Sequence, residues 1–433
     1  MTTTSTATGD LDGAAGQGDL DGLRAALPSD VQRPPEAYIC DGVTPALAVR
    51  PRSSAELAAT LLAADQGGLA VSPQGGRTAI TLGRPLTRYD VALDTTALDR
   101  VVDYAPEDLT ITVEAGITLA ALQATLAEQG QYLTVDPPPG EDVTIGGLLA
   151  TARSGAWRGH LPAARDLVLG AMVALCDGSL TSSGGRVVKN VSGYDMHRMH
   201  TGALGTLGVI VQASFKLAPL PAAQSSRALD CGSLAIAGEV AHTLWDRNLA
   251  TRALTILDPE AAAAIGLRRS PAVLADFAGP ETVVARCERV VDEVARERGV
   301  IAEPIEHEVW DRLRALAHSP TGAASDSTVV RVGVPATNVA TLVAHASALM
   351  GPAWGHIAAG AVWGRPAADV QSLQDLRAAA ESKGGYLQIE SGSRSLREAV
   401  DPFGSGDAEL MRALKAQFDP RGTLNPGRWE AAS

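Results

Sequence analysis

Three glycine-rich segments, each at the end of a predicted strand, constrain the fold of this chain more than any other feature. They lie at residues 73–78, 136–147 and 189–208 of a 433-residue sequence. Glycine has no Cβ, so the backbone at such positions can approach a ligand closely. Each segment alone is typical of an ordinary loop, but three of them together favour one shared ligand.

The first segment, residues 73–78 (PQGGRT), follows a short apolar strand that ends at Val71. Its adjacent glycines allow successive N–H groups to point inward and form a concave, anion-binding nest. Thr78 adds a hydroxyl donor and Arg77 a fixed charge, so the loop suits the diphosphate of a dinucleotide. A tight turn between two strands is the alternative interpretation.

The other two segments have the same character. Prolines make the approach to Gly146 and Gly147 rigid, and these glycines again allow a ligand to lie against the backbone. The third segment contains Lys189, one of only four lysines in the chain. A lysine at this position is therefore not a product of composition.

Apolar periodicity predicts alternating strands and helices up to a proline pair, Pro219 and Pro221, which marks the best domain boundary. Ser53-x-x-Glu56 predicts a helix start, and the elements between 222 and about 400 cannot be ordered from the pattern. We therefore expect a disordered acidic tail at 1–30, a first domain at 31–221 and a second domain at 222–404. A C-terminal helix and tail follow at 405–433.

Charge and cysteine usage exclude several classes of protein. The net charge of −13 disfavours binding to nucleic acid or to an anionic membrane surface. The four cysteines form no C-x-x-C pair, so neither a metal cluster nor a disulfide scaffold is expected. The sequence contains no uncharged apolar stretch of about 18 residues, so no transmembrane helix is expected. The first residues lack the pattern of a signal peptide. These features predict a cytoplasmic protein without a metal.

Common nucleotide-binding and hydrolase motifs are missing from the sequence. No G-x-G-x-x-G follows a strand, none of the lysines follows a glycine as in a Walker A loop, and no G-x-S-x-G elbow is present.

The order and spacing of seven stretches resemble the FAD-binding domain of the vanillyl-alcohol oxidase (PCMH-type) superfamily. Within it, the chain most resembles the family of FAD-binding E subunits of bacterial glycolate oxidases. The match is dense over residues 40–220 and good over 405–430. The stretches that carry it are 74–77 (QGGR), 82–85 (LGRP), 103–109 (DYAPEDL), 146–147 (GG), 165–170 (RDLVLG), 189–195 (KNVSGYD) and 418–428 (FDPRGTLNPGR).

The resemblance implies an α+β fold: a two-part, PCMH-type FAD-binding domain, then an α/β cap or substrate domain, with the C-terminal tail returning to the flavin. The cofactor implied is FAD, held noncovalently because the first glycine loop has Arg77 and no histidine. The residues that would contact FAD are Pro73, Gln74, Gly75, Gly76, Arg77, Thr78, Pro137, Thr144, Gly146, Gly147, Lys189, Asn190, Gly193, Tyr194, Asp195, Val209, Ile210 and Asn425.

The resemblance also implies an activity and partners. The family oxidises glycolate, a small 2-hydroxy acid, to glyoxylate, and electrons pass through the flavin to an iron–sulfur subunit. A second FAD subunit of the D type completes the complex, and membrane association would be peripheral, through these partners. Two alternatives stay open: a stand-alone FAD oxidase of another hydroxy acid or a sugar alcohol, and a structural flavoprotein subunit without substrate chemistry.

The catalytic residues are the weakest part of this prediction. Oxidation of a 2-hydroxy acid needs a base for the hydroxyl proton and a cation for the carboxylate. Arg158, His160 and Arg165 are the candidates, although each is also typical of a protein surface. His356 has no second ligand nearby in the sequence, so no metal site is expected.

Overall fold

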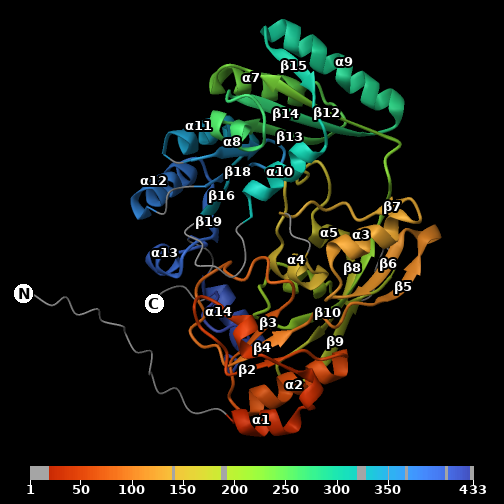
Figure 1. Ribbon diagram of the computed structural model, residues 1–433, viewed down its shortest axis with the longest axis vertical. Helices are drawn as coiled ribbons and strands as arrows, with labels where there is room; N and C mark the ends of the chain where they lie inside the picture. The colour runs from red at the N-terminus through yellow and green to blue at the C-terminus, as the bar shows by residue number, and fades with distance from the viewer. Residues whose placement is uncertain are drawn as a thin grey trace, which may run out of the picture.

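The computed structural model describes residues 19–138, 142–186, 193–318, 328–349, 351–365, 369–404 and 408–429. These residues form two stacked halves, and the lower half in Figure 1 holds both the first part of the chain and its C-terminal helix. The chain crosses from β11 (Ala218–Pro219) to β12 (Ala223–Asp230), the first strand of the upper half. The expected boundary at the proline pair falls in this connection.

A four-stranded sheet beside α2 (Ser54–Gln66) forms the first unit of the lower half. Helix α2 begins where Ser53 accepts a hydrogen bond from the N–H of Glu56 at 3.2 Å, so the predicted helix start is confirmed. Leu57 and Leu61 of α2 are buried against the strands. The strands, in spatial order, are β1 (Gln32–Arg33), β2 (Leu47–Val49), β4 (Val91–Asp94) and β3 (Val71–Gln74), the last three parallel.

A five-stranded antiparallel sheet forms the second unit and has a core on each face. Side chains of β10 (Val209–Lys216) alternate between the two cores. Ile210 joins the core with α3 (Leu119–Ala127) and α4 (Ile145–Thr151), whereas Val209 and Val211 join the core with α2. The strands, in spatial order, are β5 (Val101–Ala105), β6 (Thr110–Glu114), β10 (Val209–Lys216), β8 (Val168–Ala174) and β9 (Leu180–Gly184). The smaller elements are α3 (Leu119–Ala127), α4 (Ile145–Thr151), α5 (Ala164–Leu167), α6 (His197–His200) and β7 (Gln131–Tyr132), which pairs with β11.

The upper half is one antiparallel sheet of eight strands with helices on both faces. Four helices, α7 (Leu234–Asp246), α9 (Glu281–Arg298), α11 (Val339–Leu349) and α12 (Val370–Glu381), pack on one face. The opposite face packs against α8 (Pro259–Ala264), α10 (Glu308–Leu316) and Ala156 of the lower half. The strands, in spatial order, are β15 (Ile301–Pro304), β12, β14 (Ala272–Gly279), β13 (Thr251–Leu257), β17 (Ala353–His356), β18 (Ala361–Gly364), β16 (Val329–Gly333) and β19 (Tyr386–Ser391).

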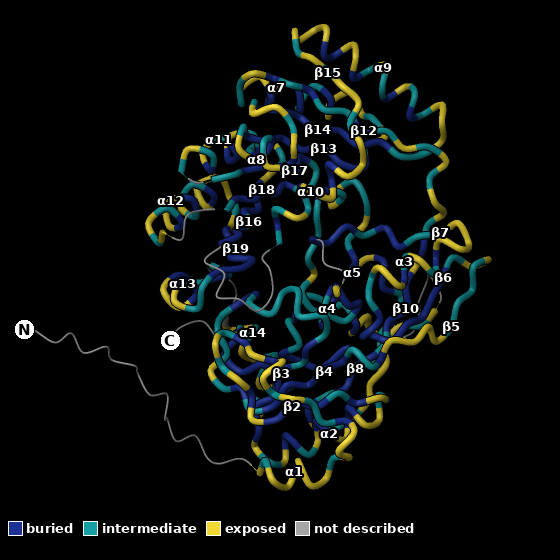
Figure 2. Tube along the Cα trace, in the orientation of Figure 1, coloured by how far each residue is buried: buried dark blue, intermediate teal, exposed yellow. Residues whose placement is uncertain are grey.

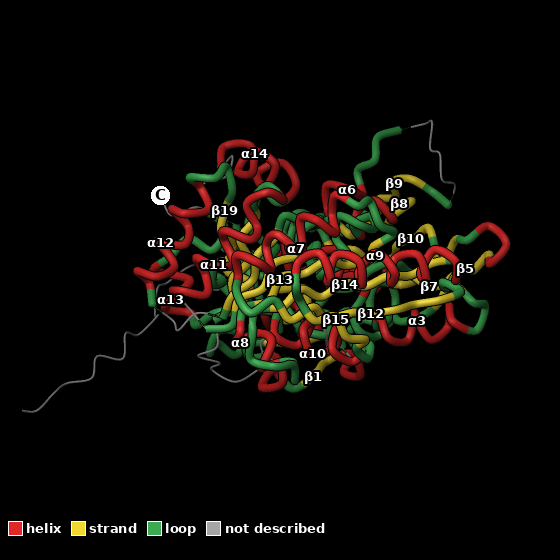
Figure 3. The backbone as a smooth tube through the Cα atoms, turned by 90° about the horizontal axis from the view of Figure 1, so that it is seen from above, coloured by secondary structure: helices red, strands yellow, loops and turns green. Residues whose placement is uncertain are grey.

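Seen from above in Figure 3, helices flank this sheet on both sides. Figure 2 shows that the buried backbone follows the strands, while α1 (Leu20–Ala26) and α9 carry much of the exposed surface. The face of this sheet that packs against α8, α10 and Ala156 is the one directed toward the lower half. Helix α13 (Arg394–Ala399) precedes the return of the chain downward.

The C-terminal tail is built into the lower half. After α14 (Ala408–Phe418), Leu424 pairs in parallel with Val71 of β3. Asp419 accepts the N–H groups of Thr423 and Leu424 at 2.8 and 2.7 Å, which fixes the turn before this pairing. Residues more than 300 positions apart in the sequence therefore meet at the end of β3.

Three local expectations differ from the structure. The disordered tail predicted at 1–30 is wrong from residue 20 onward, because α1 (Leu20–Ala26) buries Leu23 against α2. The alternation of Leu109, Ile111 and Val113 predicts a half-buried strand, but all five residues of β6 are buried. The pattern from Asp166 to Gly178 predicts a strand, but this stretch starts with α5 and continues as β8.

No helix among the described residues is long and apolar enough to span a membrane.

Candidate functional site

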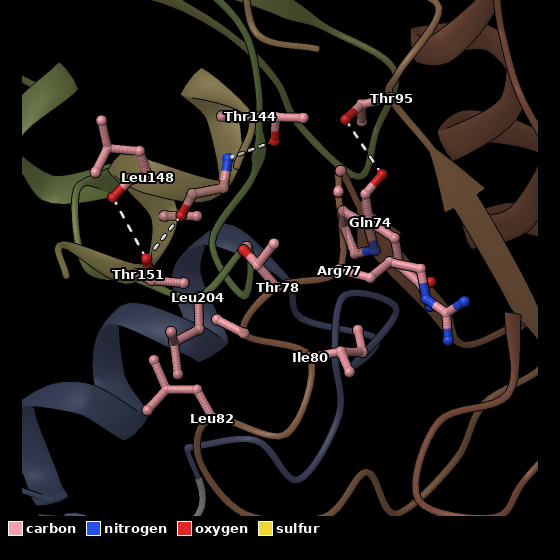
Figure 4. A pocket seen from close by; sticks show the side chains of 18 of the residues that line it. Gln74, Arg77, Thr78, Ile80, Leu82, Thr95, Thr144, Leu148, Thr151 and Leu204 are labelled. Carbon is pink, nitrogen blue, oxygen red and sulfur yellow. Dashed lines mark hydrogen bonds between the residues drawn. The ribbon is translucent and has the colours of Figure 1, made fainter. Parts of the chain in front are cut away.

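A cavity of about 1020 Å³, part of it open to solvent, lies between the end of β3, α4, the segment 204–210 and the C-terminal tail. Figure 4 looks into it, with Gln74, Arg77 and Thr78 on one wall and Leu148 and Thr151 of α4 on the other. Of the residues expected to contact a cofactor, these line the cavity: Pro73, Gln74, Gly75, Gly76, Arg77, Thr78, Pro137, Thr144, Gly146, Gly147, Val209, Ile210 and Asn425.

The glycines of the first loop are required by close packing as well as by the nest. A Cβ on Gly76 would lie 1.4 Å from the carbonyl oxygen of Asp142, and one on Gly75 would lie 2.1 Å from Oγ1 of Thr144. Thr144 is the N-cap of α4 and accepts the N–H of Gly147 at 3.2 Å. The two glycine-rich segments therefore touch each other and form one continuous wall.

Arg77 holds the first loop in place. Its φ of 61° is left-handed, which is rare outside glycine. The guanidinium donates to the carbonyl oxygens of Ala37 and Ile39, the latter at 2.5 Å, and lies over the ring of Tyr38. Two main-chain carbonyls, one in the 3₁₀ turn η2 (Pro35–Tyr38) and one directly after it, thus pair with the guanidinium that we expected to bind an anion.

A chain of buried hydrogen bonds fixes Gln74. Its Nε2 donates to the hydroxyl of Tyr89 at 2.6 Å, and that hydroxyl donates to the carbonyl of Tyr38 at 2.7 Å. Burial raises the pKa of Tyr89, so the phenol stays neutral. The amide of Gln74 is therefore oriented with its Oε1 as the open acceptor.

Several buried polar atoms of the cavity walls have no hydrogen-bond partner within the described chain. They are Ser72 Oγ, Gln74 Oε1, Arg77 Nε, His200 Nδ1 and Asn425 Oδ1. Each such atom costs about 1–3 kcal/mol when it stays unpaired. A ligand that both donates and accepts hydrogen bonds removes this cost. The amide oxygens of Gln74 and Asn425 accept from a hydroxyl or N–H group, whereas Arg77 Nε donates to an oxygen such as that of a phosphate.

One end of the cavity reaches the upper half through Arg153. Its Nε donates to Oε2 of Glu390 on β19 at 3.0 Å, and its Nη2 donates to the carbonyl of Ala317 after α10 at 3.1 Å. The other carboxylate oxygen of Glu390 accepts from Nε of Arg331 on β16, also at 3.0 Å. Glu390 is 2% exposed, so two cations share one buried carboxylate at the junction of the halves.

His318 lies next to this group of charges. Burial, together with the charges of Arg153 and Arg365, lowers its pKa, and its Nδ1 has no partner within the described chain. The imidazole is therefore neutral near pH 7.

The catalytic candidates from the sequence do not line this cavity. Arg158 and Arg165 are exposed. His160 is bonded through Nδ1 to Thr251 Oγ1 at 2.8 Å, and burial lowers its pKa to about 4. The structure therefore places these three residues outside the cavity. Their positions depend on how the two halves pack, which the local sequence does not reveal.

Within the described residues, only the later part of the third glycine-rich segment lines the cavity, through His200, Leu204, Gly205 and Gly208. Tyr194 is 87% exposed, and neither it nor Gly193 or Asp195 lines the cavity. Lys189 and Asn190 lie outside the described residues.

Sequence reasoning missed part of the cavity wall. The glycines at 205 and 208 gave the only signal near His200, whereas Arg153 carried none. The missed lining residues include Ser72, Thr95, Pro138, Thr151, Arg153, His200, Leu204, Gly205, Gly208 and Arg428.

A second polar cluster, Asp65, Cys176 and Asp419, has the spacing of a metal site but not the chemistry. Every carboxylate oxygen already accepts a hydrogen bond, from Thr423, Arg421, Leu424 or Lys415. Burial raises the pKa of Cys176 to about 11, so the thiol stays protonated. This cluster anchors the tail.

Two family models match the chain. Residues 45–184 match the model described as FAD binding domain, and residues 392–429 match FAD linked oxidases, C-terminal domain. The first range contains the glycine-rich walls and the second contains the returning tail.

Relatives with known names are similar over most or part of the chain. The mitochondrial D-lactate dehydrogenase [cytochrome] of Arabidopsis thaliana is 26% identical over 89% of this chain and 73% of its own length. Glycolate oxidase subunit GlcD of Bacillus subtilis is 25% identical over 89% and 88%. Glycolate oxidase subunit GlcE of Escherichia coli is 38% identical, but over 35% of this chain and 43% of that protein.

Solved structures have the same fold. p-Cresol methylhydroxylase with substrate bound superposes with a TM-score of 0.75 at 15% identity, covering 94% of this chain and 95% of that one. Alkyldihydroxyacetonephosphate synthase gives a TM-score of 0.71 at 18% identity, covering 94% and 85%.

The predicted fold class is thus confirmed: the chain has the α+β fold of PCMH-type FAD oxidases. FAD is its cofactor, and the protein is an FAD-dependent oxidoreductase.

Proposed function

We propose that this chain is the FAD-binding subunit of a dehydrogenase complex that oxidises a small 2-hydroxy acid, with glycolate as the first candidate substrate. The observation that carries the proposal is the pair of arginines around Glu390, at the end of the FAD cavity that meets the upper half. Two cations against one buried carboxylate leave an excess of positive charge, which a substrate carboxylate balances.

The residues at this end have separate tasks. Arg153 and Arg331 bind and orient the carboxylate, with Arg331 itself held by Gln388 and Tyr386. His318 takes the hydroxyl proton at its unpartnered Nδ1. Bound FAD supplies the hydride acceptor. The packed tryptophans of the upper half, Trp354 and Trp363, lie at this junction and keep water away.

The proposal of a complex rests on the relatives. A stretch of this chain is 38% identical to a protein named glycolate oxidase subunit GlcE, and D- and iron–sulfur-type subunits are the partners that we propose. The full-length similarity to proteins named D-lactate dehydrogenase supports a second candidate, a stand-alone FAD-dependent dehydrogenase of a D-2-hydroxy acid.

An anaerobic titration tests these candidates. The purified chain is mixed with glycolate, D-lactate or D-2-hydroxyglutarate, alone and with a D-type flavoprotein and an iron–sulfur subunit, and the flavin absorbance is followed. Reduction only in the presence of the partners supports the complex, and reduction by the chain alone supports the stand-alone enzyme. A flavin that no hydroxy acid reduces in either setting contradicts the proposal.

A further inference from the structure

His200 lines the cavity and lies within the third glycine-rich segment, but it was not among the residues expected to contact FAD. It is the last residue of α6, is 5% exposed, and packs its ring edge-on against Phe418 of α14 with centroids 6.0 Å apart. Its Nδ1 has no hydrogen-bond partner within the described chain. A buried nitrogen in this state needs a partner from a ligand or a trapped water.

The position of His200 identifies the end of the cavity. A Cβ on Gly208 would lie 3.2 Å from Cε1 of His200, and Gly208, Val209 and Ile210 line the cavity beside it. These residues belong to the interior of the lower half. Arg153, in contrast, reaches strands of the upper half.

FAD has two ends, and only one can meet a substrate. The flavin ring must lie where a substrate can enter between the halves, which is the end at Arg153. The loop at 73–78 receives the diphosphate in the middle of the cavity. The adenosine half is left for the end at His200.

We propose that His200 hydrogen-bonds the adenosine half of FAD through Nδ1 and thereby selects FAD over FMN, which lacks that half. This inference depends on FAD as the cofactor and not on the identity of the substrate.

The chemistry of the ring suits this task. Burial and the neighbouring His197 lower the pKa of His200 to about 4, so the imidazole is neutral near pH 7. A neutral imidazole offers one donor and one acceptor nitrogen. Adenosine offers both kinds of partner, in its ribose hydroxyls and its base.

The same helix supplies a matched control. His197 is 3% exposed, and its Nδ1 is 3.2 Å from Oγ of Ser183, so its ring already has a partner. It does not line the cavity. Replacing either histidine by phenylalanine removes a buried imidazole from α6, but only one replacement touches the ligand.

The test compares His200→Phe, His200→Asn and His197→Phe. The bound flavin is first removed from each variant, and the apoprotein is then reconstituted with added flavin. Dissociation constants for FAD and FMN are measured by flavin fluorescence, and ADP is used as a competitor. For His200→Phe we expect affinity for FAD and for ADP to fall about tenfold, the loss of one neutral hydrogen bond, with FMN unchanged. His200→Asn, whose amide reaches the place of Nδ1, restores most of this loss.

Other results would overturn the proposal. If His200→Phe weakens FAD and FMN equally, or leaves ADP competition unchanged, the histidine does not contact adenosine. The same holds if His197→Phe changes the ratio of FAD to FMN affinity as much as His200→Phe does. If His200→Phe does not fold, His200→Leu replaces it in the test. Unchanged ADP binding by the His200→Leu apoprotein would then contradict the proposal.

Discussion

Replacing Arg153 by leucine removes one of the two cations that share Glu390. The side chain of Arg153 is 9% exposed and that of Glu390 is 2% exposed. Loss of one partner from a buried pair costs about 3–5 kcal/mol when the other charge is left alone. Here Glu390 keeps its bond to Arg331, so we expect a smaller loss of folding free energy.

The effect on catalysis is larger than the effect on folding. If Arg153 binds the substrate carboxylate, its removal costs about 2 kcal/mol, the value of one hydrogen bond to a charged group. This corresponds to a fall of about 30-fold in kcat/KM for a hydroxy acid. Arg153→Lys keeps the charge but not the two-pronged geometry, so it recovers part of the loss.

The assay is steady-state kinetics with an artificial electron acceptor, together with the flavin content of each variant. Arg158→Leu is the control, since Arg158 is an exposed arginine five residues away. We expect Arg153→Leu to keep its flavin and lose activity, and Arg158→Leu to behave as the wild type. The reasoning is refuted if Arg153→Leu stays within twofold of the wild-type kcat/KM, or if Arg158→Leu shows the same loss.

Three further perturbations have defined outcomes. Gly76→Ala places a Cβ on a carbonyl oxygen and should abolish flavin retention in an absorbance assay, whereas Gly185→Ala, with open space around it, should not. Truncation after Phe418 removes the strand pairing with β3 and the anchored turn, so flavin binding should be lost; retention of flavin would contradict this role of the tail. Burial lowers the pKa of His356 from 6.5 to about 3, so the wild type loses stability as pH falls from 6.5 towards 3. His356→Gln should flatten this limb of a thermal-unfolding profile, and the exposed control His307→Gln should leave it unchanged.

Local sequence was a good guide where one segment decides its own structure. The capping pair at Ser53 and Glu56 gives α2, and the adjacent glycines at 75 and 76 give the wall of the cavity. In both cases backbone conformation and close approach depend on neighbours in the chain. The fold class followed from the spacing of several such segments.

Contacts between distant segments could not be predicted in this way. Arg153 meets Glu390 across 237 positions, and nothing near either residue marks the pair. Arg158 and His160 follow a glycine pair in the sequence, yet neither lines the cavity. The upper sheet was not ordered because its strands, such as β13 between β14 and β17, pair without regard to sequence order.

The central claim is that the glycine-lined cavity holds FAD. Native mass spectrometry of the purified chain, with the flavin released by heat and identified, tests it most directly. The account predicts one FAD per chain, and this FAD comes off unmodified when the protein is denatured. A covalent bond between FAD and the first glycine-rich loop would need a different side chain at the position of Arg77. A chain that stays colourless after incubation with FAD, or that releases another molecule from this cavity, would contradict it.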